Sequence, residues 1–159
     1  MSNDNANSTP GPVLALDVGT RRIGLAVSDQ RRSMALPLET VDARSTPKAL
    51  QRIVDQVRDY EVAEIVVGWP LDMQGVEGRA VDRVRRIIDG LERQLEKQNL
   101  ADVPIYRWDE RLTTTAADRL LIDADMSRSR RKTVVDQVAA CKILEGFLAQ
   151  ARQNGGGRP

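Results

Sequence analysis

The feature that most constrains the fold is the stretch from Val13 to Thr20, which reads VLALDVGT. A continuous apolar run that ends near a glycine is typical of a strand buried on both faces, so this stretch predicts the central strand of a sheet. Side chains alternate along a strand, and Asp17 therefore shares one face with Val13 and Ala15. The sequence places a carboxylate at the tip of a buried strand.

Burying an ionised carboxylate costs free energy unless a positive partner meets it. A metal ion, a nearby arginine or the amides of a helix would serve as that partner for Asp17. The structural alternative is an aspartate that forms a turn or caps a helix, as is common at strand ends. Which of these interpretations holds for Asp17 depends on the other acidic and basic residues of the chain.

Further strands are predicted after this one, and helices alternate with the later strands. The strands are expected at 23–29, around 34–41, at 63–68 and at 103–108. Helices are expected from Thr46 (N-cap, with Pro47 at the first position), over 78–98, after 109–114, and over about 132–151. This order predicts an α/β fold: a five-stranded mixed sheet with helices on both faces.

The organisation along the chain is simple. Polar residues 1–12 and glycine-rich residues 153–159 are predicted to be disordered tails on either side of a single domain, 13–152. No apolar run is long enough to span a membrane, and the N-terminus has no apolar signal segment. Together with the single cysteine, these features predict a cytoplasmic protein with no membrane partner.

Composition excludes several kinds of site. The chain has no histidine and one cysteine, which rules out histidine-based catalytic triads and cysteine-rich zinc sites. Any metal would need oxygen ligands, which suits Mg²⁺ or Mn²⁺. Aromatic residues make up 3% and the net charge is +1, so nucleic-acid binding would depend on local basic clusters rather than on stacking platforms or overall charge.

Acidic residues stand at the ends of three predicted elements: Asp17, the pair Asp109-Glu110, and Asp136. Asp136 lies on the apolar stripe of the last helix, in its predicted first turn, where the helix dipole favours a negative charge. Its structural alternative is helix stabilisation, with Lys132 as a partner. Carboxylates gathered at neighbouring strand ends repel one another unless divalent cations neutralise them, and a histidine-free cluster of this kind suits phosphodiester cleavage.

Basic residues adjoin each of these acids. Such clusters fix a phosphate backbone without reading sequence, and their structural alternative is a solvated loop. The predicted nucleic-acid-binding residues are Arg21, Arg22, Arg111, Arg128, Arg130, Arg131 and Lys132, the last four in a loop before the final helix. Trp69 and Trp108 at strand ends are interpreted as packing residues, and Cys141 as a small core residue.

Four motifs in this order resemble the YqgF/RuvX family of bacterial ribonuclease H-like nucleases. They are DVGTRRIG at 17–24, GWPLDMQG at 68–75, DERLTT at 109–114, and the spaced Lys132, Asp136, Ala139 and Ala140. Trp69 departs from the aliphatic residue usual in the family. The resemblance implies a ribonuclease H-like fold and a metal-dependent endonuclease whose catalytic and metal-binding triad is Asp17, Glu110 and Asp136, with Asp109 as the neighbouring alternative.

Family members are associated with maturation of the 5′ end of 16S ribosomal RNA, and others are described as Holliday-junction resolvases. The resemblance therefore implies structured RNA or branched DNA as substrate, with a ribosomal precursor particle or a homodimer as the corresponding assembly. Two other classes stay open. The DVGT motif also occurs in actin-like ATPases and sugar kinases, which need a second domain that this chain has no room for. A nucleic-acid-binding module without cleavage activity is the third class.

Overall fold

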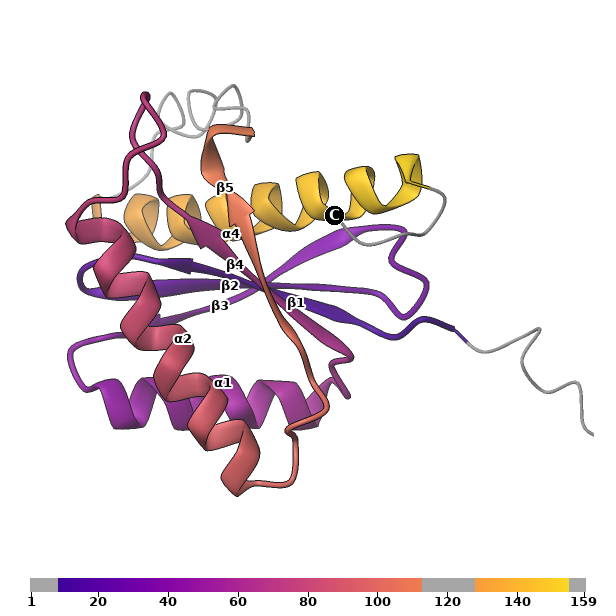
Figure 1. Ribbon diagram of the computed structural model, residues 1–159. Helices are drawn as coiled ribbons and strands as arrows, with labels where there is room; N and C mark the ends of the chain where they lie inside the picture. Colours follow the sequence, from indigo (N-terminus) through magenta and orange to yellow (C-terminus); the bar gives the residue numbers. More distant parts are fainter. Residues whose placement is uncertain (1–8, 113–127, 155–159) are drawn as a thin grey trace, which may run out of the picture.

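The computed structural model describes residues 9–112 and 128–154, with only the backbone path given for 128–134 (Figure 1). Its five strands form one mixed sheet in the order β3-β2-β1-β4-β5. Strands β1, β2 and β3 pair antiparallel, while β4 and β5 continue the sheet parallel to β1. The strands are β1 (Val13–Val18), β2 (Arg22–Ser28), β3 (Ala35–Asp42), β4 (Glu64–Trp69) and β5 (Ile105–Asp109).

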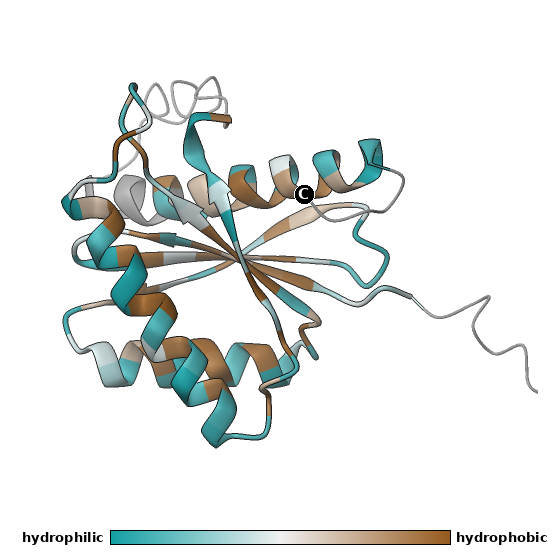
Figure 2. Ribbon diagram, in the orientation of Figure 1, coloured by the Kyte–Doolittle hydropathy of each residue, from teal (hydrophilic) through white to brown (hydrophobic). Residues whose placement is uncertain are grey.

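Helices cover both faces of this sheet, as predicted. Helices α1 (Thr46–Asp59) and α2 (Arg79–Lys97) lie on one face, and the long helix α4 (Arg128–Gln153) crosses the other (Figure 1). A short 3-10 turn, η2 (Glu110–Leu112), follows β5. Figure 2 shows hydrophobic residues where the helices meet the sheet. No helix in the described part of the chain is both long and apolar enough to cross a bilayer.

The predicted apolar stripes form two core clusters, one on each face of the sheet. Helices α1 and α2 bury Ile53, Val54 and Leu91 against the odd-numbered face of β4, which includes Ile65 and Val67. Helix α4 buries its own stripe against Val13, Ala15 and Val66 on the other face, through Ala140, Ile143, Leu144, Phe147 and Leu148. The alternation along β1 therefore turns Asp17 toward α4, together with Val13 and Ala15.

Two predictions about helix starts are wrong. Ser45, not Thr46, is the N-cap of α1, and Thr46 and Pro47 both lie inside the helix. Helix α4 begins at Arg128, so the basic run 128–132 forms its first turns rather than a preceding loop. Asp136 lies eight residues beyond this start, and the free amides of the first turn are too far away to explain its position.

The ends of the chain were also predicted from composition. The inner end of the predicted N-terminal tail is held in place, because Gly11 N–H donates to Gln30 O at 3.1 Å and Ala63 N–H donates to Pro12 O at 2.8 Å. Helix α4 ends at Gln153, the first residue of the predicted C-terminal tail. Residues 1–8, 155–159 and the helix expected after 114 lie outside the described residues.

Candidate active site

Asp17 has a glycine as its neighbour on each of the two adjoining strands. Its cross-strand partner on β2 is Gly24. On β4, the pairing of Leu16 with Val67 brings Gly68 level with Asp17. Neither neighbour carries a side chain, so the sheet leaves open space on both sides of the Asp17 carboxylate on the face toward α4.

Glu110 fills the space on the β4 side. A Cβ added to Gly68 would collide with Glu110 Oε1 and would come within 2.7 Å of Ile143 Cδ1. The glycine is therefore needed for the Glu110 carboxyl to lie flat on the sheet beside Asp17. The structure brings two of the three predicted acids together, from strand ends that are 93 residues apart in sequence (110 minus 17).

Glu110 holds its proton more tightly than an ordinary glutamic acid does. Burial raises the pKa of Glu110 to about 7, and the charge of Asp17, a hydrogen bond to Asp17 and the charge of Asp109 act in the same direction. A hydrogen bond that raises the pKa of an acid is one that the protonated acid donates, so Glu110 donates to the Asp17 carboxylate. This pair holds a proton that an added cation would displace.

Asp136 fills the space on the β2 side, but it faces a different partner. The α4 backbone at Asp136 presses onto Gly24, where an added Cβ would come within 2.6 Å of the Asp136 carbonyl carbon. Arg22, two residues before Gly24 and on the same face, donates from Nε to Asp136 Oδ2 at 2.8 Å. Among the described side chains, no three acidic or other ligand groups are close enough together to hold a metal ion. The Asp136 backbone thus lies over Gly24, the cross-strand neighbour of Asp17, while its carboxylate is held by Arg22, two residues along β2 from Gly24.

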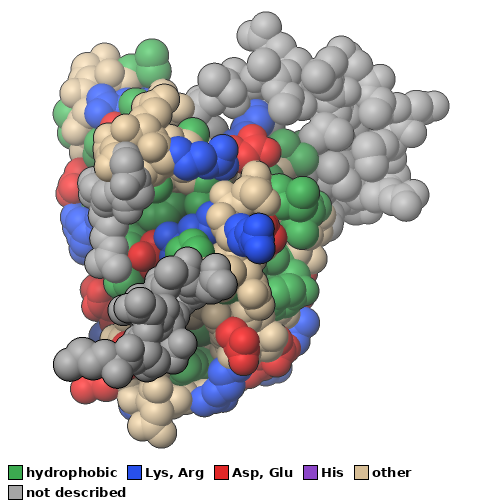
Figure 3. Space-filling view, turned by 90° about the vertical axis from the view of Figure 1, so that its right-hand side faces the viewer, with side chains coloured by type: hydrophobic (Ala, Val, Ile, Leu, Met, Phe, Trp, Pro, Cys, Tyr) green, Lys and Arg blue, Asp and Glu red, His purple; other side chains and the backbone are tan. Residues whose placement is uncertain are grey.

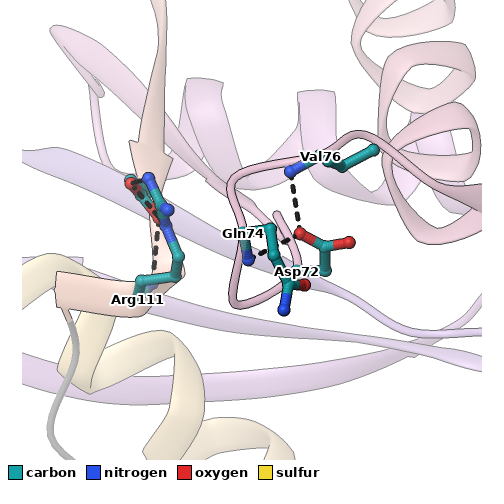
Figure 4. A network of polar contacts seen from close by, with 5 residues as sticks. Asp72, Gln74, Val76 and Arg111 are labelled. Atoms are coloured by element: carbon teal, nitrogen blue, oxygen red, sulfur yellow. Dashed lines mark hydrogen bonds and ion pairs between the residues drawn. The ribbon is translucent and has the colours of Figure 1, made fainter.

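The Asp109 side chain points to the opposite face of the sheet and forms an ion pair with Arg111. It pairs across the strands with Trp69. Arg111 donates to it from Nε at 3.0 Å and from Nη2 at 2.7 Å, and the resulting hydrogen bonds hold the pKa of Asp109 below its usual value. Figure 4 shows Arg111 beside the loop in which Asp72 accepts hydrogen bonds from the backbones of Gln74 and Val76. Of the two adjacent acids, Glu110 is the one beside Asp17.

The predicted basic residues are divided between a groove and helix α4. Arg21 and Arg22 line a groove of about 480 Å³ along the β3 edge of the sheet, together with Arg44 and Gln137. Arg111 is engaged with Asp109. The backbone of Arg128, Arg130, Arg131 and Lys132 lies in the first turns of α4, but their side chains lie outside the described residues, and so does the alternative pairing of Lys132 with Asp136.

A second hollow, of about 540 Å³, lies at the other end of the sheet. It is lined by residues near the start of β1 and the end of α4, among them Arg31, Arg32, Leu148 and Arg152. Figure 3 views the molecule from this end and shows Lys and Arg side chains among hydrophobic ones. Arg32 donates to Gly11 O at 2.8 Å and to Glu64 Oε2 at 3.1 Å, so its guanidinium anchors the N-terminal segment.

Both tryptophans are packing residues, as predicted. Trp108 is 5% exposed and rests on Gly146 of α4, where an added Cβ would come within 2.7 Å of its ring. Trp69 is 6% exposed, and the Arg107 guanidinium lies 4.0 Å from its ring centroid. Cys141 is half-buried against the α4-side core, and burial raises the pKa of its thiol to about 11. The two tryptophan rings are therefore largely closed to a ligand, and Cys141 packs at the edge of the core.

The roles of Gly24 and Gly68 were not predicted. Both were visible as glycines within or at the end of predicted strands, a pattern that marks close approach of another group. Neither stands at a positive φ, so their role is to leave space rather than to permit an unusual backbone. The two glycines let α4 and Glu110 reach the sheet on either side of Asp17.

The raised pKa of Glu110 predicts an unusual pH dependence of stability in metal-free buffer. Because the folded-state pKa, about 7, exceeds the ordinary value of 4.5, this group stabilises the fold fully below pH 4.5 and loses that contribution as pH rises through 7. After allowance for solvent screening, we expect the free energy of unfolding to fall by about 1–2 kcal/mol between pH 5 and pH 8.

This expectation is checked by urea unfolding at pH 5 and pH 8 in EDTA, with E110Q as the test variant and E92Q, at an exposed position of α2, as the control. E110Q should lose the pH-dependent fall, because its amide does not titrate, and E92Q should keep it. An E110Q protein with the wild-type pH dependence would show that Glu110 does not titrate in this window.

Comparison with known proteins assigns the chain to a family. The RuvX family model, described as "Holliday junction resolvase", matches residues 11–150. The chain belongs to the RuvX family. A protein of Roseiflexus sp. named "Putative pre-16S rRNA nuclease" is 45% identical over 146 residues, covering 92% of this chain and 99% of its own length. A protein of Halothermothrix orenii with the same name is 42% identical, covering 86% and 93%.

Solved structures support the fold. A structure described as "T. thermophilus RuvC in complex with Holliday junction substrate" matches with a TM-score of 0.61 at 15% identity, covering 94% of this chain and 99% of that one. A second Thermus thermophilus RuvC structure matches with a TM-score of 0.55 at 14% identity. The predicted ribonuclease H-like architecture is confirmed. The family and its fold are those of endonucleases that hydrolyse phosphodiester bonds in nucleic acids.

Proposed function

We propose that this RuvX-family chain is a divalent-metal-dependent endonuclease that matures the 5′ end of 16S ribosomal RNA. The observation that carries the proposal is the Asp17–Glu110 pair: two carboxyl groups brought together where β1 and β5 end, with the pKa of Glu110 raised to about 7 by burial and by the charge of Asp17. The relatives named for pre-16S rRNA support the substrate. A ribosomal RNA substrate implies a cytoplasmic protein, and the precursor particle is the proposed partner.

Mg²⁺ or Mn²⁺ is the proposed cofactor, because the donors at this site are all carboxylate oxygens. Asp17 and Glu110 would hold it, and Asp136 would complete the set. When bound, the cation supplies Lewis acidity at the scissile phosphate and activates water at neutral pH. The raised pKa of Glu110 fits this cofactor, since a cation would replace the Glu110 proton and offset the repulsion between the two carboxylates.

The arginines beside the acids would hold the substrate. Arg21 and Arg22 border the groove along β3, and the four basic residues at 128–132 occupy the start of α4, the helix that carries Asp136. Guanidinium groups in this position would bind backbone phosphates and orient the strand without reading its bases. Arg111 would contribute less, because Asp109 already occupies its guanidinium.

The basic run gives a measurable salt effect. We expect the combined replacement of Arg128, Arg130, Arg131 and Lys132 by Ala to flatten the slope of log affinity against log salt by about 3, since each lost phosphate contact reduces it by about 0.7–0.9. Fluorescence anisotropy with labelled RNA between low and moderate salt measures this slope. Alanine at Arg93, an exposed position on α2, is the control. An unchanged slope in the fourfold variant would exclude phosphate contacts by the run.

Branched DNA is the second candidate substrate, favoured by the description of the family model. Resolving a junction requires a symmetric dimer with two sites on opposed strands. The test is a side-by-side assay of a 16S precursor RNA and a four-way DNA junction, each with Mg²⁺, Mn²⁺ or EDTA. Metal-dependent cutting of the RNA alone supports the proposal, and cutting of the junction alone replaces it. Cutting of neither, even with precursor particles added, favours a binding module without cleavage activity.

A further inference from the structure

Arg22 belongs to two features at once. Its Nε donates to Asp136 Oδ2, and the same side chain lines the groove along β3. Gln137, the residue after Asp136, lines the groove as well, so the groove ends beside the acid. The side chains of Arg22 and Asp136 are 38% and 24% exposed, so the ion pair is partly open to solvent, and Arg22 is the member that lines the groove.

The groove suits an anion, because its acidic residues are already neutralised. Asp42 is paired with Arg44, with Nη2 of the arginine 2.6 Å from Oδ2. Glu39 is paired with Arg52 at 2.9 Å and also accepts a hydrogen bond from Gln56. Arg21 has no ion pair among the described side chains and lies at the groove beside Arg22. The remaining unpaired charge on the lining is positive.

We propose that Arg22 is a phosphate-dependent switch that controls whether Asp136 joins the Asp17–Glu110 pair. Without nucleic acid, Arg22 holds Asp136 apart from the other two carboxyl groups. A backbone phosphate that enters the groove binds the Arg22 guanidinium and releases Asp136. This inference rests on the proposed function, since it assumes that the groove receives a nucleic-acid backbone.

The exchange of partners is favourable for a physical reason. This ion pair is partly exposed and has one hydrogen bond, so its contribution is modest, because water reaches and screens it. A backbone phosphodiester carries one negative charge, as the Asp136 carboxylate does, but it can accept two parallel hydrogen bonds from one guanidinium, whereas Asp136 accepts one from Arg22 Nε. Arg22 would therefore prefer the phosphate whenever the groove is occupied.

The backbone around the switch is already positioned, so only side chains have to move. Gly19 N–H donates to Arg22 O at 2.8 Å, and Ala43 N–H donates to Arg21 O at 2.8 Å, which fixes the turn that carries both arginines. Asp136 rests on Gly24, and Gly24 pairs with Asp17. Only Gly24 lies between the Asp136 backbone and Asp17, so a rotation of the released Asp136 side chain would bring its carboxylate toward Asp17.

A switch of this kind couples nucleic-acid binding to metal binding. If phosphate releases a third carboxylate, the cation binds more tightly in the presence of nucleic acid, and by linkage the nucleic acid binds more tightly in the presence of the cation. The site would then assemble its full set of metal ligands only when a substrate strand is in place. Metal affinity measured without any cleavage reports this coupling.

The test is titration of Mn²⁺ followed by electron paramagnetic resonance, with and without a saturating RNA duplex whose phosphorothioate linkages suppress cutting. For the wild-type protein we expect the duplex to tighten Mn²⁺ binding at least about fivefold, the lower end of ordinary coupling. R22A should bind Mn²⁺ with the tighter affinity even without RNA and gain nothing further from the duplex. R22K should retain part of the RNA-dependent gain, because its ammonium can still pair with Asp136.

R21A is the matched control, because it removes the same charge from the same turn without removing an ion pair of Asp136. Its Mn²⁺ affinity without RNA should equal that of the wild type. If R21A and R22A raise Mn²⁺ affinity equally, the increase comes from the loss of a positive charge near the site. The proposal that Arg22 acts as a switch is then wrong. The switch is also wrong if R22A keeps both the wild-type Mn²⁺ affinity and the wild-type gain. Failure of the proposed function appears separately, as absence of metal-dependent cutting in the substrate assay.

Discussion

Replacing Asp17 by Asn is expected to reduce cleavage at least about 10³-fold while leaving the fold intact. The amide has the shape of the carboxylate and can still accept a hydrogen bond from Glu110, but it lacks the negative charge and so ligates a hard cation poorly. Metal-ion catalysis supplies several kcal/mol of transition-state stabilisation, and each 1.4 kcal/mol is a factor of ten in rate. The central position of Asp17, between Gly24 and Gly68, leaves no other residue of the row to replace it.

The measurement is single-turnover cleavage of the substrate that the wild-type protein cuts. Binding of that substrate should be equal to or tighter than wild type, because the variant removes a negative charge near the phosphates. D89N, at an exposed position of α2, is the control for loss of a carboxylate elsewhere. Cleavage by D17N at the wild-type rate would falsify the assigned site.

Gly24→Ala should be the most damaging of the small substitutions near the site. The added methyl group would stand 2.6 Å from the Asp136 carbonyl carbon and closer still to its oxygen, and both are backbone atoms of α4 that cannot rotate away. Helix α4 would have to lift from β2, along which it packs. We expect a loss of about 2–3 kcal/mol in the free energy of unfolding, since overpacking outweighs the entropy gained from replacing glycine.

Thermal unfolding followed by circular dichroism measures this loss, expected as a fall in Tm of about 5–10 °C. Activity should fall further than stability accounts for, because the movement carries Asp136 away from Arg22 and from the acid pair. Gly78→Ala is the matched control: its added Cβ has no neighbour within 4 Å, and its φ of −123° is open to alanine. A Gly24→Ala protein as stable as Gly78→Ala would mean that α4 does not rest on β2 at this point.

Much of the fold could be predicted from local patterns. The apolar run 13–18 indicated a central strand, and the periodic stripes of α1, α2 and the later part of α4 indicated their buried faces. These features depend on the alternation of polar and apolar residues, which a sequence displays directly. Helix starts were less accessible. Helix α4 begins at Arg128 because polar residues without an apolar stripe can still form its first turns.

The candidate site was predictable only in part. The acids at the ends of strands could be named in advance, since carboxylates next to buried strands require an explanation. The choice between Asp109 and Glu110 could not be made, because it depends on which face each side chain takes where β5 passes into η2. The tertiary structure places Glu110 over Gly68 and turns Asp109 toward Arg111.

The sequence by itself determined the central strand, the predominantly oxygen-based chemistry that any metal site would have, and the family to which the chain belongs. The tertiary structure decided which side chains meet. Asp136 pairs with Arg22, 114 residues away, and a contact at that separation depends on how α4 crosses β2 rather than on any local spacing. The same reason applies to Gly24 and Gly68, which leave space for α4 and for Glu110. Which group fills the space beside a glycine is determined by the tertiary fold and cannot be seen in the sequence.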